Sequence, residues 1–74
     1  MERLGGAKPK SLTVNGEPRD IAAANLAEAL VALDYEDAIV ATALNGAFVP
    51  KRKRAETQLR EGDRIEIVAP RQGG

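Results

Sequence analysis

The chain has 74 residues, of which 43% are hydrophobic and 30% charged, and its 11 Lys and Arg balance its 11 Asp and Glu. A chain of this length forms one small domain around one core. Because its net charge is zero, we expect no strong attraction to nucleic acid or to an anionic membrane. The lack of Cys and His removes thiol nucleophiles, disulfides, imidazole bases and most zinc ligand sets. We therefore expect neither a metal site nor an enzyme with its own catalytic residues.

Residues 1–10 follow neither the period of a strand nor that of a helix, and they contain Gly5, Gly6 and Pro9. The sequence predicts a flexible extension there. No apolar run approaches the roughly 20 residues that cross a bilayer, and the first residues lack the apolar segment of a signal peptide. We expect a cytoplasmic protein without a membrane partner.

A β-hairpin is predicted from Ser11 onward. Residues 11–14 alternate polar and apolar side chains, and Asn15-Gly16 is a strong signal for a two-residue type I′ turn into residues 17–21. Pro18 has no amide hydrogen to donate to a ladder. The second strand is therefore expected at an edge of the sheet.

Residues 22–33 change to the period of a helix. Asn25 is expected to cap its start, with Glu28 three residues later in a variant of the capping box. The helix has no Gly to end it near Asp34. Three leucines share the face that is expected to meet the sheet: Leu26, Leu30 and Leu33.

A second hairpin is predicted around Asn45-Gly46. The β-branched run at residues 38–44 is long enough for a central strand, and residues 47–50 return beside it. The basic run at residues 51–54 could contact phosphates, but the neutral chain favours a solvated loop, with docking to an acidic partner as the second interpretation. Leu59 is an isolated apolar anchor.

The last strand is predicted at residues 64–69, after a turn at residues 61–63. Alternation directs Ile65 and Ile67 inward, and Glu66 and Val68 outward. We expect the outward face beside the C-terminal segment to be the docking surface, formed by Val68 and Glu66, with Phe48 as a further member if it also points outward.

The order of elements is hairpin, helix, hairpin and strand. One helix laid across one face of a sheet buries both apolar surfaces. The sequence therefore predicts an α+β roll, in which a mixed four- to five-stranded sheet packs on one main helix. The last strand is expected in the middle of the sheet, beside the first.

An ordered set of motifs resembles the ThiS family of sulfur carriers in thiamine biosynthesis, which are ubiquitin-like β-grasp proteins. The set comprises residues 45–50, Leu59, residues 61–67 and the final Gly73-Gly74. The resemblance covers residues 11–74 and implies a β-grasp domain at residues 11–69 with a flexible tail at residues 70–74. Two features depart from it, the very basic run at residues 51–54 and an Asp at position 34, where a Gly that ends the helix is common.

The resemblance implies that Gly74 is the residue that is modified. In this family a ubiquitin-activating-type (ThiF-like) adenylyltransferase uses ATP to adenylate the terminal carboxylate. A cysteine desulfurase or another persulfide donor then supplies sulfur for a thiocarboxylate, which serves thiazole synthase (ThiG-like). Gly73, Gln72 and Arg71 would thread the partner's channel. No cofactor bound to the chain itself is implied.

The tail suits this chemistry on physical grounds as well. A carboxylate is a poor electrophile until AMP, a good leaving group, is attached. Glycine lacks a Cβ, so two glycines can pass through a narrow channel. The five residues at 70–74 reach roughly 16 Å when extended, which lets the domain dock outside an active site.

Two alternatives remain open. A related β-grasp carrier or modifier, serving molybdopterin synthesis, tRNA thiolation or attachment to lysines, would share the chemistry at Gly74 and differ in its partner. A regulatory or RNA-binding β-grasp module would instead use residues 51–54 as its contact, and its terminal glycines would be incidental.

Overall fold

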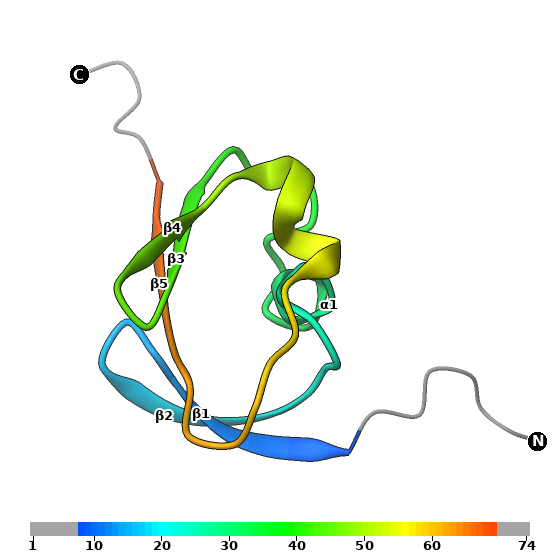
Figure 1. The fold of residues 1–74 in the computed structure, drawn as a ribbon, viewed down its shortest axis with the longest axis vertical. Helices are drawn as coiled ribbons and strands as arrows, with labels where there is room; N and C mark the ends of the chain where they lie inside the picture. Colours follow the sequence, from blue (N-terminus) through cyan, green and yellow to red (C-terminus); the bar gives the residue numbers. More distant parts are fainter. Residues whose placement is uncertain (1–7, 70–74) are drawn as a thin grey trace, which may run out of the picture.

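The computed structural model describes residues 8–69 (Figure 1). The segments 1–7 and 70–74 lie outside this range, so the flexibility predicted for them stays a prediction. The described residues form seven elements in chain order: β1 (Pro9–Val14), β2 (Glu17–Ala22), α1 (Leu26–Ala32), β3 (Ala41–Leu44), β4 (Ala47–Val49), the 3-10 helix η1 (Lys51–Glu56) and β5 (Arg64–Val68).

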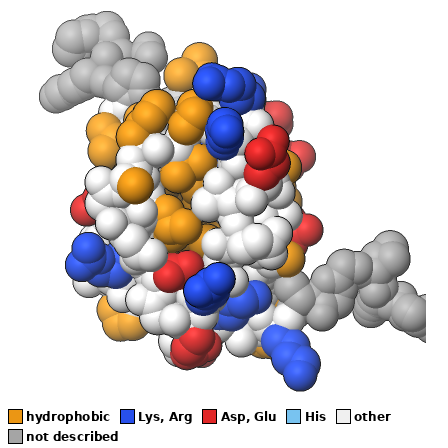
Figure 2. Space-filling view, in the orientation of Figure 1, with side chains coloured by type: hydrophobic (Ala, Val, Ile, Leu, Met, Phe, Trp, Pro, Cys, Tyr) orange, Lys and Arg blue, Asp and Glu red, His pale blue; other side chains and the backbone are white. Residues whose placement is uncertain are grey.

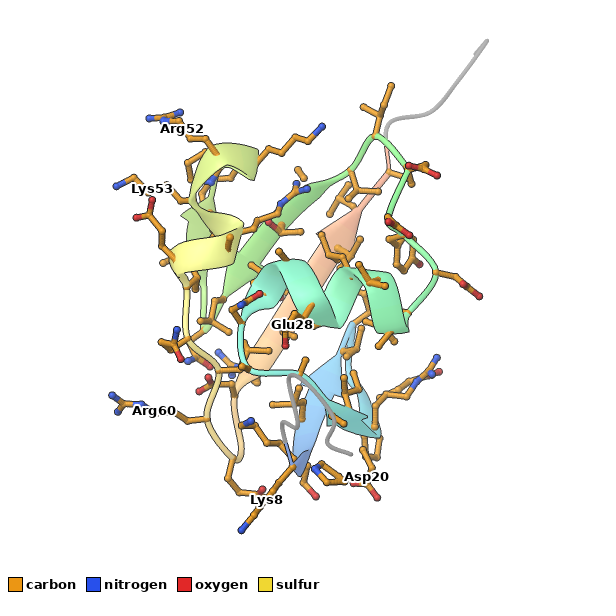
Figure 3. All side chains as sticks on the ribbon, turned by 90° about the vertical axis from the view of Figure 1, so that its right-hand side faces the viewer. Lys8, Asp20, Glu28, Arg52, Lys53 and Arg60 are labelled. Carbon is orange, nitrogen blue, oxygen red and sulfur yellow. The ribbon has the colours of Figure 1, made fainter. Side chains whose placement is uncertain are left out.

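The strands form one mixed sheet in the order β2-β1-β5-β3-β4. The last strand, β5, lies in the centre, parallel to β1 and antiparallel to β3. Pro18 lies in the edge strand β2, where it needs no ladder partner on its outer side. The helix α1 crosses one face of this sheet (Figure 3). The predicted α+β roll, with its last strand beside its first, is confirmed.

The first strand begins earlier than predicted. Pro9 and Lys10 pair with Ala22 and Ile21 in β2, so they belong to the hairpin and not to an N-terminal extension. The Lys10 Nζ also donates a hydrogen bond of 2.9 Å to the Ala23 carbonyl. At this level β1 pairs with the edge strand β2 alone, since β5 joins it only at Thr13 and Val14. The start of β1 is therefore largely uncovered and polar, and its sequence carries no apolar alternation that would reveal a strand.

Both hairpin turns have the type I′ conformation, which was predicted for the first of them. Asn15 and Gly16 have φ of 51° and 84°, and Asn45 and Gly46 have φ of 51° and 87°. Two consecutive residues with positive φ define this turn, and its twist matches that of the flanking strands. The Asn-Gly pairs therefore set the register of both hairpins.

The helix begins as predicted, with one difference in its cap. The Asn25 Oδ1 accepts a hydrogen bond of 2.9 Å from the Glu28 amide, as in a capping box. The Glu28 Oε1 in turn accepts from the amide of Ala24, at 2.8 Å, and not from the amide of Asn25. Leu26 and Leu30 are buried, whereas Leu33 lies at the C-cap and is half-buried.

The core lies between α1 and the inner face of the sheet. Strand alternation and the helix face supply most of it, and Leu59 fills it from the segment before β5 as predicted. Its buried hydrophobic residues are Leu12, Val14, Ile21, Ala23, Leu26, Ala29, Leu30, Val49, Leu59, Ile65 and Ile67.

The helix ends at a left-handed Asp34, with φ of 69°. The Tyr35 amide donates to the Leu30 carbonyl at 2.7 Å, and the Asp34 amide donates to the Val31 carbonyl at 3.1 Å. These two bonds form a Schellman motif, whose left-handed position glycine occupies without strain. Asp34 thus serves where a helix-ending Gly is more usual.

Replacing Asp34 with Gly is expected to stabilise the domain. A side chain in the left-handed region costs about 1–2 kcal/mol, and the greater freedom of Gly in the unfolded chain offsets part of the gain. We expect Asp34→Gly to raise the free energy of unfolding by about 0.5–1 kcal/mol, measured by urea denaturation. Asp34→Ala keeps the Cβ and serves as the control. A lower stability for the Gly variant would contradict the assigned helix end.

The predicted strand at residues 38–44 is wrong in its first part. β3 begins only at Ala41, and residues 38–40 have no regular structure. The neighbouring strands end at this level, because Ala41 pairs with Val68 at the end of β5, and β4 is followed by Pro50, the N-cap of η1. A β-branched sequence alone cannot extend a strand beyond its partners.

The prediction of a solvated loop at residues 51–54 is wrong for the backbone conformation and for Arg54. These residues begin η1, and Arg54 is only 8% exposed. Its Nη2 donates to the Val40 carbonyl at 2.7 Å and its Nε to the Thr42 Oγ1 at 3.1 Å. Lys51, Arg52 and Lys53 are exposed, and the labelled side chains of Arg52 and Lys53 project away from the domain (Figure 3).

Candidate functional site

The end of β5 is the point from which the chain continues into residues 70–74. Ile65 and Ile67 are buried along this strand, and Glu66 and Val68 are exposed, as the alternation predicts. Val68 is the last residue of the strand, and its side chain is 63% exposed. The final segment therefore leaves the domain beside an exposed apolar side chain.

The register of the sheet brings the predicted docking residues together. Ala43 pairs with both Phe48 and Glu66, so these three residues form one row across β4, β3 and β5. Ala41 and Val68 form the next row, nearer the end of β5. Paired residues point to the same face of a sheet, and Phe48 is 69% exposed.

We call these five residues, Phe48, Val68, Glu66, Ala41 and Ala43, the open-face patch. It lies on the face of the sheet opposite the core. The pairing of these rows places Val68, Glu66 and Phe48 on one surface. Figure 2, seen from the open edge between the sheet and the helices, shows a band of hydrophobic side chains that runs from the top of the molecule down its middle, with Lys and Arg side chains beside it near the top.

Four predicted site residues lie outside the described range: Arg71, Gln72, Gly73 and Gly74. Their roles remain predictions from the sequence.

Two turn asparagines hold β5 in place. The Asn15 Oδ1 accepts from the Ile67 amide at 2.8 Å, and its Nδ2 donates to the Ile67 carbonyl at 3.2 Å. Asn45 accepts from the Arg64 amide through its Oδ1 at 2.9 Å. Asn15 thus replaces a strand partner for β5 where its pairing with β1 ends.

These side-chain contacts were not predicted. The sequence predicts Asn15 and Asn45 as turn residues only, because the type I′ conformation accounts for their presence there. The bonds join positions 52 and 19 residues apart in sequence. The only available signal was the use of Asn, whose amide can both donate and accept, at the first position of both turns.

The acidic turn before β5 has a structural role. The Glu61 Oε1 accepts from the Ser11 amide at 3.2 Å, and the Asp63 Oδ2 accepts from the Arg60 amide at 2.8 Å. Within residues 8–69 no group of three or more His, Cys, Asp or Glu side chains is arranged to hold a metal ion. The helices of this part of the chain are too short or too polar to cross a membrane.

The topology defines the class of the protein. A mixed sheet with its last strand in the centre, crossed on one face by a single main helix between two hairpins, is the β-grasp or ubiquitin-like fold. A family model, the ThiS family, matches residues 12–74. The chain belongs to the ThiS family.

A solved structure supports this assignment. The crystal structure of a thiamine biosynthesis protein (ThiS) from Geobacter metallireducens is 34% identical, with a TM-score of 0.72 over 86% of this chain and 99% of that chain. The expected β-grasp fold is thereby confirmed.

A curated relative is much longer. A thiazole synthase from Paramagnetospirillum magneticum is 39% identical over 64 residues, which is 85% of this chain. The chain spans only 20% of the length of that relative.

Proposed function

We propose that this protein is a sulfur carrier in thiamine biosynthesis and that Gly74 is the residue that carries the sulfur. The observation that supports this proposal most strongly is the match to the ThiS family, which extends through residue 74 and so includes Gly73-Gly74. The fold supports it as well, because the central strand β5 leads directly into the tail.

The chemistry takes place at the terminal carboxylate. An adenylyltransferase of the ubiquitin-activating type joins the carboxylate of Gly74 to AMP from ATP, and AMP becomes the leaving group. The outer sulfur of a persulfide donor, such as a cysteine desulfurase, then attacks the acyl adenylate and displaces AMP. A second thiol reduces the S–S bond of the resulting acyl disulfide and releases the thiocarboxylate. The protein is a substrate of these enzymes. It contains neither Cys nor His with which to perform such steps itself.

The proposed acceptor of the sulfur is thiazole synthase. This partner is supported by the thiazole synthase relative, in which a segment similar to this chain makes up one fifth of the polypeptide. A carrier-like segment and the name of that enzyme thus occur on one chain. The related pathways for molybdopterin and for tRNA thiolation would use the same chemistry at Gly74 with other partners.

The folded domain supplies the specificity that the tail lacks. A channel that accepts two glycines cannot by itself distinguish this protein from other chains that end in Gly-Gly. The open-face patch is the proposed docking surface, with Phe48 and Val68 as its apolar centre and Glu66 on its polar rim. An apolar centre with a polar rim is the usual anatomy of a modest interface.

Introducing a charge at Val68 is expected to weaken binding to the adenylyltransferase by about 1–3 kcal/mol, the range for loss of one anchor. Val68 is 63% exposed, so Val68→Asp is expected to fold normally. The dissociation constants of Val68→Asp and of the wild type are measured by titrating each protein against the adenylyltransferase. Ala22→Asp, an exposed position on the edge strand β2, is the control. Equal affinity of Val68→Asp and the wild type would exclude Val68 from the interface.

The proposal is tested by ATP–pyrophosphate exchange. We expect a ThiF-like adenylyltransferase from the same organism to exchange label between pyrophosphate and ATP only when this protein is present. A molybdopterin-type adenylyltransferase in a parallel assay tests the related pathway. No exchange with the ThiF-like enzyme would contradict a role in thiamine synthesis, and exchange only with the other enzyme would assign the related pathway.

A further inference from the structure

Ile39 is an exposed apolar residue that the fold does not explain. It is 82% exposed, more than Phe48 at 69% or Val68 at 63%. It lies in the irregular segment of residues 38–40, between α1 and β3. An isoleucine side chain favours a strand or a core, and here it occupies neither.

The position of Ile39 places it beside the exit of the tail. Ala41 pairs with Val68, and β3 runs antiparallel to β5, so the residues before Ala41 lie at the end where β5 finishes. Figure 1 shows the segment that precedes β3 at the same end of the molecule as the end of β5. Ile39 thus lies at the end of the domain where β5 finishes, close to the row formed by Ala41 and Val68.

The reach of the tail requires a partner at this end. Residues 70–74 span roughly 16–18 Å when fully extended. An enzyme that acts on Gly74 must therefore lie against the end of the domain from which this short segment leaves. Burial of Ile39 against such an enzyme would remove its apolar surface from water.

The segment that carries Ile39 is held by a buried charge. Arg54, only 8% exposed, donates to the Val40 carbonyl at 2.7 Å. Its Nε donates to the Thr42 Oγ1 at 3.1 Å, and that hydroxyl donates to the Val49 carbonyl at 2.9 Å. Burying a charged group is costly unless it is well hydrogen-bonded, and here the bonds fix the residue next to Ile39 to β3 and β4.

A hollow of about 230 Å³ lies between this segment and η1. Ile39 and Val40 line one side, and Lys51 and Arg54 line the other. Ile39 is therefore presented at a rim rather than on a flat surface.

We propose that Ile39 is a specificity-determining contact for the adenylyltransferase and that Arg54 is the positioning residue that presents it. The inference rests on the proposed function. The adenylyltransferase is the chosen occupant because it meets an unmodified carboxylate, a group common to all chain ends, and must select its substrate through the folded domain. An enzyme that accepts sulfur can recognise the thiocarboxylate itself.

The first experiment compares Ile39→Ser with the wild type in ATP–pyrophosphate exchange by the ThiF-like adenylyltransferase. We expect the KM for the carrier to rise about tenfold, as for loss of an apolar anchor, with kcat unchanged because Gly74 is intact. Val31→Ser, at a position on α1 that is 52% exposed, is the matched control and is expected to stay within about twofold of the wild type.

The second experiment tests Arg54 through a double-mutant cycle. Arg54→Met is expected to raise the KM in the wild-type background and to have no further effect on the KM in the Ile39→Ser background, because Arg54 acts through Ile39. Arg54→Lys keeps one donor and is expected to restore part of the affinity. A purely structural role would lower stability in both backgrounds without this non-additivity.

The outcomes separate the two proposals. An active wild type with Ile39→Ser at the wild-type KM would overturn the role of Ile39, and with it that of Arg54, and leave the carrier function standing. Absence of exchange with the wild type would overturn the proposed function and this inference with it. If Arg54→Met does not fold, the KM of Ile39→Ser still decides whether Ile39 contacts the adenylyltransferase.

Discussion

Removal of Gly74 is expected to abolish adenylation and to leave the fold unchanged. The truncated chain still ends in a glycine, but its carboxylate falls about 3.3 Å short of the reacting atoms, and misplacement on this scale is costly to catalysis. The buried core ends at Ile67 and β5 ends at Val68. The free energy of unfolding should therefore change by less than about 0.5 kcal/mol.

The measurement pairs ATP–pyrophosphate exchange with urea denaturation of the same two proteins. A variant with Gly5 deleted is the control, because it removes the same residue type from the other end of the chain. Adenylation of the truncated chain at the rate of the full chain would contradict the assignment of Gly74.

Truncation of Leu26 is expected to be the most destabilising of the changes considered. Its side chain is fully buried, with 0% exposure, at the start of α1. Replacement of a buried Leu with Ala costs about 2–5 kcal/mol, because the lost burial adds to the cavity that remains. Small domains have a total stability of about 5–15 kcal/mol, so Leu26→Ala should lose much of it.

Val31→Ala on the same helix is the matched control. Val31 is 52% exposed, so this change should cost less than about 1 kcal/mol. Glu28→Ala is a poorer control, because Glu28 accepts the hydrogen bond from the Ala24 amide at the helix start. Urea midpoints compared at a constant m-value measure the difference. Equal costs for Leu26→Ala and Val31→Ala would mean that the buried face of α1 is wrongly assigned.

The features that sequence predicts well here depend on neighbouring residues. Asn15-Gly16 and Asn45-Gly46 require positive φ at two consecutive positions, and this requirement alone defines the turns. The cap at Asn25 is likewise local. Alternation along β5 predicts its buried face, because the period of a strand leaves only two choices.

The features that were missed depend on contacts between distant parts of the chain. Arg54 appears in the sequence as one of four successive basic residues, and only the fold brings its guanidinium to the Val40 carbonyl, 14 residues away. The late start of β3 at Ala41 had a signal in Pro50, which cannot donate a backbone hydrogen bond to β3 and is the N-cap of η1.

The candidate site was predicted in part for the same reason. Val68 and Glu66 follow from alternation on β5, and the register of β3 and β4 then places Phe48 beside them. Ile39 could not be found in this way, because the sequence places it inside a central strand. Ile39 is exposed because β4 and β5, the two strands that flank β3, do not extend as far as residue 39.

Intact mass spectrometry of the protein from cells that are making thiamine tests the assignment of Gly74 as the sulfur-carrying residue most directly. We expect a population whose mass is higher by the replacement of one oxygen with sulfur, and fragmentation should locate this change at Gly74. The change should be absent when the ThiF-like adenylyltransferase is deleted. An unmodified C-terminus in cells that depend on their own thiamine synthesis, or a modification elsewhere in the chain, would contradict the sulfur-carrier function.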